Sequence, residues 1–373
     1  HGISVTGSSL SQATPLARNR NPVAAMVTFH VALVSLTLVA LPVQSLFLYL
    51  DTEQQPREHS SCGFGHILPE FYVLGAKNSA TTSLARDLRH SGVVAAPVDD
   101  GKEWQFFREH DDHPKDDDKL FARWLSKLPP CPPERSILAD FSVTNLFLVQ
   151  LPSDFEWSPK YGFLGTGPSA WATPHRISYF YRTAGADSVP PKFVVLLRDP
   201  VARTQSEYYH TLPKRNCNGC MVTDNFVDSF AFNVDLLRKK QMSDWFWKSF
   251  YARHVEEFEK EFDASQFMLV PNKEYFAIDP QGFSTELLSW LELPDAKPWK
   301  EASKENVHVK PELDTELPPD HPARVLYQAL MEPECQRLVH LMVRMHKHGA
   351  VLAGYDGRVG DEVAVRAWLE NGW

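Results

Sequence analysis

Two segments, 72–84 and 193–210, constrain the fold of this chain more than any other part of its sequence. They read YVLGAKNSATTSL and FVVLLRDPVARTQSEYYH, and in each an apolar run leads into a polar loop and then a helical pattern. Such a strand, loop and helix hold phosphate in α/β proteins, because loop amides and the helix N-terminus face the anion. Two such units predict a nucleotide with phosphate at both ends.

Short apolar runs alternate with helical patterns along the chain. The run 193–197 is apolar throughout, which is typical of a strand in a parallel sheet that is covered on both faces. The sequence therefore predicts an α/β protein, a single domain with a central parallel sheet flanked by helices. The expected strands are 71–74, 137–142, 193–197 and 267–270. The expected helices are 82–90, 171–182, 284–293 and 323–347, with further long helices within 227–262.

The N-terminal region carries the strongest compositional signal. From Val23 to Leu50 there is no charged side chain, and about 20 apolar residues suffice to span a bilayer. Arg18 and Arg20 precede this run, so we expect a type II signal-anchor with its N-terminus in the cytosol. A cleaved signal peptide is the alternative, although the run is longer than its usual apolar core. The expected division is a cytosolic tail 1–22, a transmembrane helix 23–50, a stem 51–67, a folded domain 68–352 and a C-terminal tail 353–373.

The rest of the chain is acidic. Residues 51–373 contain 47 acidic and 36 basic side chains, a net charge of −11. We therefore expect no nucleic-acid partner, although a local basic groove within an acidic surface stays open.

Five cysteines, at positions 62, 131, 217, 220 and 335, allow one or two disulfides in an oxidising compartment. Cys217 and Cys220 flank an Asn-Gly turn and could close a small loop. A zinc site is the alternative for this pair, but no second pair with ligand spacing exists, and we expect no metal.

Polar side chains in the two loops are the candidate anion ligands. The first loop carries four hydroxyl residues at its helix start: Ser79, Thr81, Thr82 and Ser83. These hydroxyls could cap the helix or bind an anion. In the second segment, Arg198 ends the strand and Ser206 follows about two helical turns later. Arginine can grip phosphate through two donors, but Arg198 with Asp199 and Pro200 could also form a structural turn.

The two segments together resemble the PAPS-dependent sulfotransferases, where PAPS is 3′-phosphoadenosine 5′-phosphosulfate. In that family a loop with a Lys-x-Gly-Thr-Thr-like core cradles the 5′-phosphosulfate, and an Arg with a Ser eight residues later binds the 3′-phosphate. Arg198 and Ser206 match this spacing. The resemblance implies PAPS as co-substrate, held by Lys77, Asn78, Ser79, Ala80, Thr81, Thr82, Ser83, Arg198 and Ser206.

A third segment, 102–107, reads KEWQFF and resembles the Lys-Glu-x-His-Phe-Phe segment of the Golgi glycosaminoglycan sulfotransferases. In those enzymes the Glu is the base that acts on the acceptor hydroxyl. The resemblance implies that Glu103 is catalytic, with Lys77 and Lys102 as catalytic cations. Taken alone, Glu103 would read as a surface carboxylate, and Asp140 and His175 are the alternative bases.

The chain departs from the family's pattern at three positions. Gln105 stands where the family has His. Asn78 stands where the loop lysine belongs, and Lys77 lies one residue earlier. Either the loop bends so that Lys77 reaches the nucleotide, or Lys102 substitutes, or activity is weak. Ala80 replaces a glycine, which raises the question of whether this position has positive φ.

The resemblance implies a P-loop-like sulfotransferase fold and transfer of a sulfuryl group from PAPS to a hydroxyl of a glycan in the Golgi lumen. Acceptors of another kind, a protein tyrosine or a small molecule, and a catalytically weak glycan-binding relative stay open. A P-loop kinase would need Gly-Lys-Ser/Thr where residues 80–82 are Ala-Thr-Thr. Candidate acceptor contacts are the aromatic residues Trp104, Trp171 and Tyr179 and the basic residues Lys192, Lys214 and Arg215.

Overall fold

A computed structural model gives the structure of this protein, whose chain divides into two compact units, His1–Glu53 and Gln54–Trp373. The structure describes these residues, all in the second unit: 60–95, 103–107, 117–147, 155–157, 173–186, 189–213, 221–276, 279–293, 296–304 and 317–372. The expected cytosolic tail, 1–22, and transmembrane helix, 23–50, lie outside them. Of the helices that are described, none has both the length and the hydropathy needed to cross a membrane.

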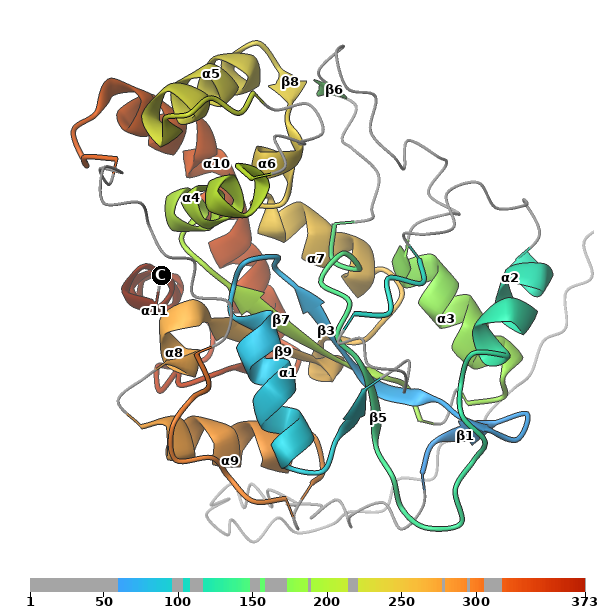
Figure 1. Ribbon diagram of the computed structural model, residues 1–373. Helices are drawn as coiled ribbons and strands as arrows, with labels where there is room; N and C mark the ends of the chain where they lie inside the picture. The colour runs from blue at the N-terminus through green and yellow to red at the C-terminus, as the bar shows by residue number, and fades with distance from the viewer. Residues whose placement is uncertain are drawn as a thin grey trace, which may run out of the picture. The chain divides into compact units, whose positions relative to one another are not determined.

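A six-stranded sheet forms the centre of the fold, with strand order β10-β9-β7-β3-β5-β4 (Figure 1). All neighbouring strands in it run parallel. Its strands are β3 (Pro69–Gly75), β4 (Val94–Ala95), β5 (Leu138–Asp140), β7 (Lys192–Leu197), β9 (Phe267–Pro271) and β10 (Val351–Leu352). Two smaller sheets pair β1 (Cys62–Gly63) with β2 (His66–Ile67) and β6 (Glu156–Trp157) with β8 (Gln241–Met242). The parallel α/β architecture expected from the sequence is confirmed.

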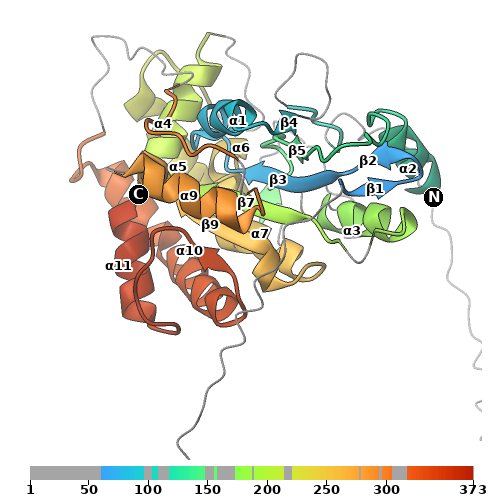
Figure 2. The ribbon, with the colours of Figure 1, turned by 90° about the horizontal axis from the view of Figure 1, so that it is seen from below.

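Helices cover the sheet on both faces. The α-helices are α1 (Thr81–His90), α2 (Asp117–Leu125), α3 (Thr173–Thr183), α4 (Pro200–Thr211), α5 (Phe226–Arg238), α6 (Asp244–Trp247), α7 (Tyr251–Glu259), α8 (Asn272–Tyr275), α9 (Pro280–Trp290), α10 (Pro322–Lys347) and α11 (Glu362–Gly372). Figure 2 shows α1 on one side of β3 and helices α3, α7 and α10 on the other. The long helices expected within 227–262 are shorter than predicted, because β8 and α6 interrupt them.

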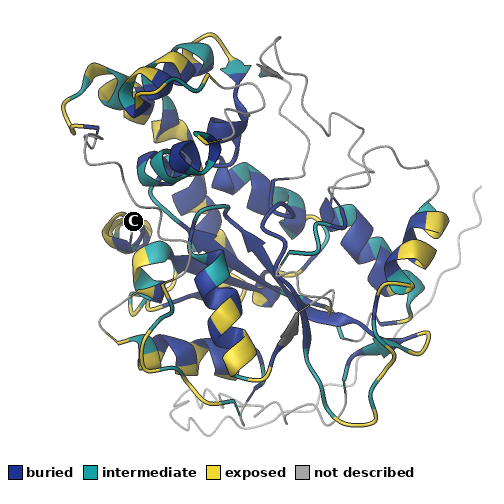
Figure 3. Cartoon of the chain, in the orientation of Figure 1, coloured by how far each residue is buried: buried dark blue, intermediate teal, exposed yellow. Residues whose placement is uncertain are grey.

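Strand side chains alternate between two hydrophobic cores, as the two-residue repeat of a strand requires. In β3, Phe71 and Val73 pack with Leu84 and Leu88 of α1. Tyr72 lies in the opposite core, which also contains residues of α3, α7 and α10. The burial colouring shows the central strands as almost wholly buried, whereas α1 exposes only its outer face (Figure 3). This two-sided burial is why residues 71–74 of β3 and 193–197 of β7 read as uninterrupted apolar runs.

Proline and a capping side chain fix the start of several helices. Asp199 accepts a hydrogen bond from the Ala202 amide (2.7 Å), and Pro200 occupies the first helical position of α4. Asp279 caps α9 in the same way through the Gly282 amide (2.9 Å). Proline is suited to this position because its missing N–H would have no partner within the helix.

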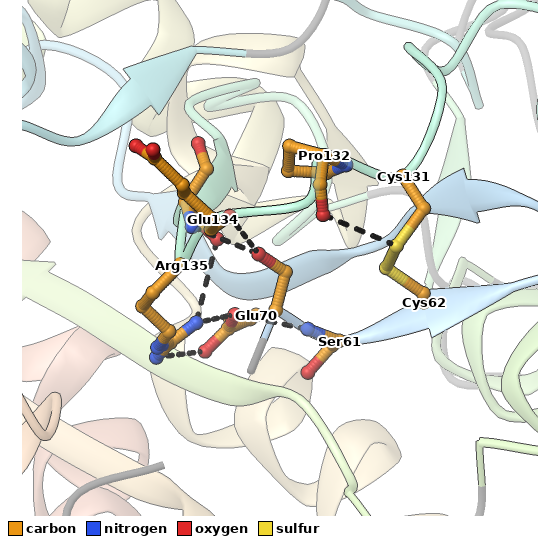
Figure 4. The surroundings of a disulfide bond; sticks show 9 residues. Ser61, Cys62, Glu70, Cys131, Pro132, Glu134 and Arg135 are labelled. Atoms are coloured by element: carbon orange, nitrogen blue, oxygen red, sulfur yellow. Dashed lines mark hydrogen bonds and ion pairs between the residues drawn. A yellow bond between two sulfur atoms is a disulfide. The ribbon is translucent and has the colours of Figure 1, made fainter. Parts of the chain in front are cut away.

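A disulfide ties the start of the fold to a distant connector. Cys62 in β1 is bonded to Cys131, which lies 69 positions later in the sequence, with a Cα–Cα distance of 5.9 Å (Figure 4). Nearby, the buried Glu70 accepts hydrogen bonds from Arg135 (Nη2, 2.8 Å) and from the Ser61 amide (3.2 Å). The fold therefore begins inside the expected stem, 51–67, because this cross-link and the β1–β2 hairpin order residues before Leu68. The Cys217–Cys220 pair lies outside the described residues.

The C-terminal segment also differs from expectation. Residues 353–373 were expected to form a peripheral tail, yet Glu362–Gly372 is helix α11. Val365 and Leu369 of this helix are buried in the core that also contains α10. The Trp368 indole donates to the Ala353 carbonyl (3.1 Å). The apolar spacing of Val365 and Leu369, four residues apart, explains why this segment packs as a helix.

Removing the disulfide should destabilise the fold strongly. It closes a long loop, so the chain-entropy argument gives a loss of about 4 kcal/mol in the free energy of unfolding for Cys62→Ala/Cys131→Ala. Urea denaturation of the described unit, residues 54–373, measures this. Cys335→Ala is the control, since Cys335 is a free cysteine, and it should cost less than about 1 kcal/mol. Equal losses for the two variants would show that the disulfide contributes nothing specific.

Candidate functional site

The candidate site lies at the carboxyl ends of three adjacent strands, β7, β3 and β5. After β3 the chain forms β4 and β5 on one side of that strand, and then β7, β9 and β10 on the other side. The direction of strand addition thus reverses at β3. In open parallel sheets, ligands bind outside the carboxyl ends of the strands at such a reversal. In the sequence, each of these three strands is followed by polar residues.

The loop between β3 and α1 is held in a tight curve. The Ala76 amide donates to the Leu196 carbonyl of β7 (2.7 Å), and the Ser79 amide donates to the Ala76 carbonyl (3.1 Å). Asn78 and Ala80 have positive φ angles of 65° and 68°. Position 80 therefore has the left-handed backbone that the family's glycine would adopt easily and that alanine adopts at a cost.

Helix α1 begins directly after this loop, and its first intrahelical bond joins the Leu84 amide to the Ala80 carbonyl (3.0 Å). The hydroxyl residues Thr81, Thr82 and Ser83 occupy its first turn. Ala80, at the N-cap position, has no side chain that can satisfy the amides there. The Ser79 Oγ is fully buried and has no hydrogen-bond partner among the described residues. This end of α1 can therefore accept an anion.

The second of the two sequence segments, 193–210, contacts the first, 72–84, directly. Arg198, at the end of β7, donates from Nη1 to the Asn78 carbonyl (2.6 Å) although the two residues are 120 positions apart. The Arg198 carbonyl in turn accepts a hydrogen bond from the Tyr251 hydroxyl (2.9 Å). Asp199 caps α4, so the structural-turn interpretation of 198–200 also applies. Ser206 lies half-buried on α4, within the same structural unit.

A buried carboxylate, Glu207, connects the two motifs. Its side chain is 1% exposed and accepts hydrogen bonds from Lys77 (2.9 Å), from the Asn78 side-chain Nδ2 and from Lys248 (3.2 Å). Arg203, one helical turn earlier, lies 3.8 Å from the same carboxylate. Burial alone would raise the pKa of Glu207, but Lys248, Lys77 and Arg203 together lower it well below its usual range. Glu207 is therefore ionised.

The two lysines on Glu207 have different environments. Lys248 is 4% exposed and also binds Asp244 (2.5 Å). Burial by itself would lower the pKa of Lys248, yet the carboxylates of Asp244 and Glu207 raise it. Lys77 is 25% exposed, and burial together with the charge of Lys248 lowers its pKa despite the pairing with Glu207. Lys77 is thus the more accessible and more easily deprotonated of the two.

A second polar cluster surrounds the end of β5. Glu103 accepts a hydrogen bond from the Gln105 side-chain amide (3.0 Å), and the Gln105 backbone amide donates to the Ser142 hydroxyl (2.7 Å). Asp140 accepts from the Ser142 amide (2.8 Å) and from the Asn145 side chain (3.1 Å). Asp140 is fully buried, and this burial raises its pKa to about 6, with a smaller contribution from the charge of Glu103.

The polar cluster at the end of β5 lies beside the loop between β3 and α1. The Leu146 amide donates to the Leu74 carbonyl of β3 (3.1 Å). Gly75 has a φ of 139°, and a Cβ there would lie only 3.0 Å from the Val143 carbonyl, so a glycine permits this close approach. The Phe147 ring lies under the Lys248 ammonium (5.1 Å). The three sequence motifs, which are far apart in the chain, therefore meet at one edge of the sheet.

Some predicted residues lie elsewhere. His175 is hydrogen-bonded to Glu261 (3.0 Å) between α3 and the end of α7, so it does not join the Glu103 cluster. Lys192 pairs with Glu292 (2.7 Å), and Tyr179 donates to Asp118. Trp104 stacks on Trp124 within the core. Lys102, Trp171, Lys214 and Arg215 lie outside the described residues.

Sequence reasoning missed Glu207 and Lys248. A signal existed for the first, because Arg203 and Glu207 are spaced four apart within α4, as an ion pair would be. No local signal existed for Lys248, whose contact with the loop depends on the tertiary fold. In the part of the chain that is described, no cluster of His, Cys, Asp or Glu could hold a metal ion.

Comparison with known proteins finds similarity in structure but not in sequence. Neither a family model nor a curated protein matches the sequence. The chain is similar to the crystal structure of a sulfotransferase from Alicyclobacillus acidocaldarius, with a TM-score of 0.47 and 21% identity over 75% of this chain and 96% of that one. A likeness at this level does not decide function, so the functional argument rests on the geometry of the site.

Replacing Ala80 by glycine should stabilise the protein. The left-handed backbone of Ala80 raises the free energy of the folded state, and alanine is a poor N-cap for α1. Glycine adopts this backbone without strain and is a better N-cap than alanine. We expect the free energy of unfolding to rise by about 1 kcal/mol, measured by urea denaturation. Ala85→Gly, within α1, should instead destabilise by about 1 kcal/mol. A loss of stability in Ala80→Gly would contradict the strained backbone at this position.

The buried Asp140 should make stability depend on pH. Its pKa is raised from 3.8 to about 6, so the folded state binds its proton more tightly than the unfolded state. This contribution is full below about pH 4 and is lost as pH rises to about 6, a change of about 3 kcal/mol. Asp140→Asn should lack it, so the stability difference between variant and wild type should change across this window. Parallel urea-denaturation profiles from pH 4 to pH 7 would contradict the assignment.

Proposed function

We propose that this protein transfers a sulfuryl group from PAPS to an acceptor hydroxyl. The observation that carries the proposal is the hydrogen bond from Arg198 to the Asn78 carbonyl (2.6 Å). This contact puts the 3′-phosphate motif beside the 5′-phosphosulfate motif, although 120 residues separate them. A binding site for one phosphate would need only one of these loops, whereas a nucleotide with phosphate at both ends accounts for both.

The residues at the site fit the donor nucleotide. The N-terminus of α1, the orphaned hydroxyl of Ser79 and the accessible Lys77 would receive the 5′-phosphosulfate. Arg198 and Ser206 would hold the 3′-phosphate. Lys77, Arg203 and Lys248 surround the carboxylate of Glu207, and Lys248 also binds Asp244. With Arg198 beside Asn78 and near Asp199, four cations lie among three carboxylates, so positive charge is in excess where the anion would bind.

Glu103 is the proposed base. It would accept the proton of the acceptor hydroxyl as that oxygen attacks the sulfur. The new S–O bond forms while the bond from sulfur to the bridging phosphate oxygen breaks, and the nucleotide leaves as PAP, 3′-phosphoadenosine 5′-phosphate. Lys77 would neutralise the charge that develops on the leaving oxygen, as in phosphoryl transfer. Lys102 is retained as a second candidate cation.

Gln105 supports this role for Glu103. It stands where the related family has histidine, and it donates to Glu103 through its side chain while its backbone binds Ser142. A Gln side chain does not titrate near neutral pH, so it cannot act as an acid or a base as a histidine can. It can orient the carboxylate of Glu103, so the base would be positioned by a neutral hydrogen bond.

A glycan in the Golgi lumen is the proposed acceptor and location. The KEWQFF segment supports the acceptor class through its resemblance to glycan sulfotransferases. The Cys62–Cys131 disulfide supports an oxidising compartment, and the uncharged run 23–50 supports a membrane anchor. A protein tyrosine or a small lumenal molecule is the alternative acceptor, and a catalytically weak PAPS- or glycan-binding relative is the alternative function.

The test combines nucleotide binding with transfer. Wild-type protein should bind PAP in calorimetry and transfer radiolabelled sulfate from PAPS to a member of a panel of glycans, tyrosine peptides and small hydroxyl compounds. Glu103→Gln should lower kcat by about 10²–10⁴-fold while PAP affinity stays within about twofold, because general-base catalysis is lost and the nucleotide contacts remain.

Glu261→Gln is the matched control. Glu261 is a partly exposed carboxylate that pairs with His175 away from the site, so its loss should leave kcat unchanged. Normal turnover in Glu103→Gln would overturn the assignment of the base. Failure of the wild-type protein to bind PAP would overturn the proposed function.

A further inference from the structure

We infer that Glu207 is a positioning residue that holds the ammonium of Lys77 in one place beside the loop between β3 and α1. Glu207 thereby compensates for a loop lysine that lies one residue before the position where the sulfotransferase pattern has it. This inference rests on the proposed function. Lysine has a flexible four-carbon stem and no preferred direction of its own. A lysine that lies one position earlier in the loop therefore needs a rigid partner that holds its ammonium in one place.

Glu207 is such a partner because it is held rigidly. It projects from α4, is 1% exposed, and is bound by Lys248 (3.2 Å), which in turn is anchored by Asp244 (2.5 Å). The same carboxylate accepts hydrogen bonds from Lys77 and from the Asn78 side chain. Two successive loop residues thus bind one buried group, which fixes the direction of the loop as well as its lysine.

Asn78 explains how the register shift is accommodated. It stands where the family has its lysine, and its positive φ turns its side chain onto Glu207. Its carbonyl accepts the Arg198 hydrogen bond (2.6 Å). Asn78 therefore joins the two phosphate motifs through its backbone and binds Glu207 through its side chain, which leaves Lys77 as the cation of the loop.

Lys77 keeps the capacity to bind a ligand. An ammonium group has three donors, and the contact with Glu207 uses one of them. Lys77 is 25% exposed, whereas Lys248 is 4% exposed and shared by two carboxylates. An anion that enters the site would therefore meet Lys77, while Lys248 stays on Glu207 and preserves the local charge balance.

A double-mutant cycle tests whether Glu207 acts through Lys77. Glu207→Gln should lower kcat for the acceptor identified in the panel by about tenfold or more, because Lys77 is no longer fixed near the leaving oxygen. The Kd for PAP should change less than about threefold, because Lys77 keeps its charge. In a Lys77→Met background the same Glu207→Gln substitution should change kcat by less than about twofold. An equal loss of kcat in both backgrounds would overturn the inference.

The pKa of Lys77 gives a readout that needs no turnover. The charged groups around Lys77 are Glu207 and Arg203 on α4, Lys248 and Asp244 at α6, and Arg198 after β7. Glu207 favours the protonated form, so Glu207→Gln should lower the Lys77 pKa further. This can be followed by NMR of the ¹³C-dimethylated lysine between pH 6 and pH 11. An unchanged pKa would overturn the Lys77–Glu207 contact. If the wild-type protein fails to bind PAP but the pKa falls, the contact stands and the proposed function fails.

Control variants separate positioning from stability. Glu334→Gln removes another buried carboxylate, the partner of Arg253 (2.5 Å) between α10 and α7, and should leave kcat and the Lys77 pKa unchanged. Should Glu207→Gln fail to fold, Glu207→Asp replaces it in the cycle, since it keeps the charge for Lys248 and Arg203 but shortens the reach to Lys77. A loss of kcat that persists for Glu207→Asp in the Lys77→Met background would overturn the inference.

Discussion

A single buried carboxylate joins the parts of this site that lie far apart in the chain. Glu207 binds the loop after β3 through Lys77, and α6 through Lys248, from its own place on α4. A charge buried this deeply costs several kcal/mol of desolvation, and only close cations with good geometry offset that cost. The consequence is a loop whose shape depends on ion pairing within the core as well as on local backbone preferences.

Because the strand order reverses at β3, Glu207 contacts a loop that lies at the carboxyl ends of the central strands. Strands β7 and β5 flank β3, so the polar ends of three strands meet. One side of the resulting site is cationic, around Lys77 and Arg198. The other side is acidic, around Glu103 and Asp140. The proposed transfer would use both environments, the cationic side for the donor and the acidic side for the hydroxyl that loses its proton.

The sequence predicted the fold and part of the site for identifiable reasons. The apolar runs of β3 and β7 and the capped start of α4 are local signals, and they led to strands and a helix at the observed positions. The contact between Arg198 and Asn78 was not predicted, although the carboxyl ends of parallel strands lie at one edge of a sheet. The contacts of Glu207 with Lys77 and Lys248 depend on packing across the chain, and no short-range pattern encodes them. The ordered start of the fold was also missed, because the Cys62–Cys131 pairing cannot be derived from cysteine spacing.

That disulfide has a consequence for proteolysis. The segment between Cys62 and Cys131 includes β3, the phosphate loop, α1 and Glu103. A single cut of the backbone anywhere within this segment leaves both pieces covalently joined. Until it is reduced, such a nicked molecule differs in mass only by one added water, and the loop after β3 stays attached to the rest of the sheet. Gel migration with and without a reductant would reveal a cleavage that is otherwise silent.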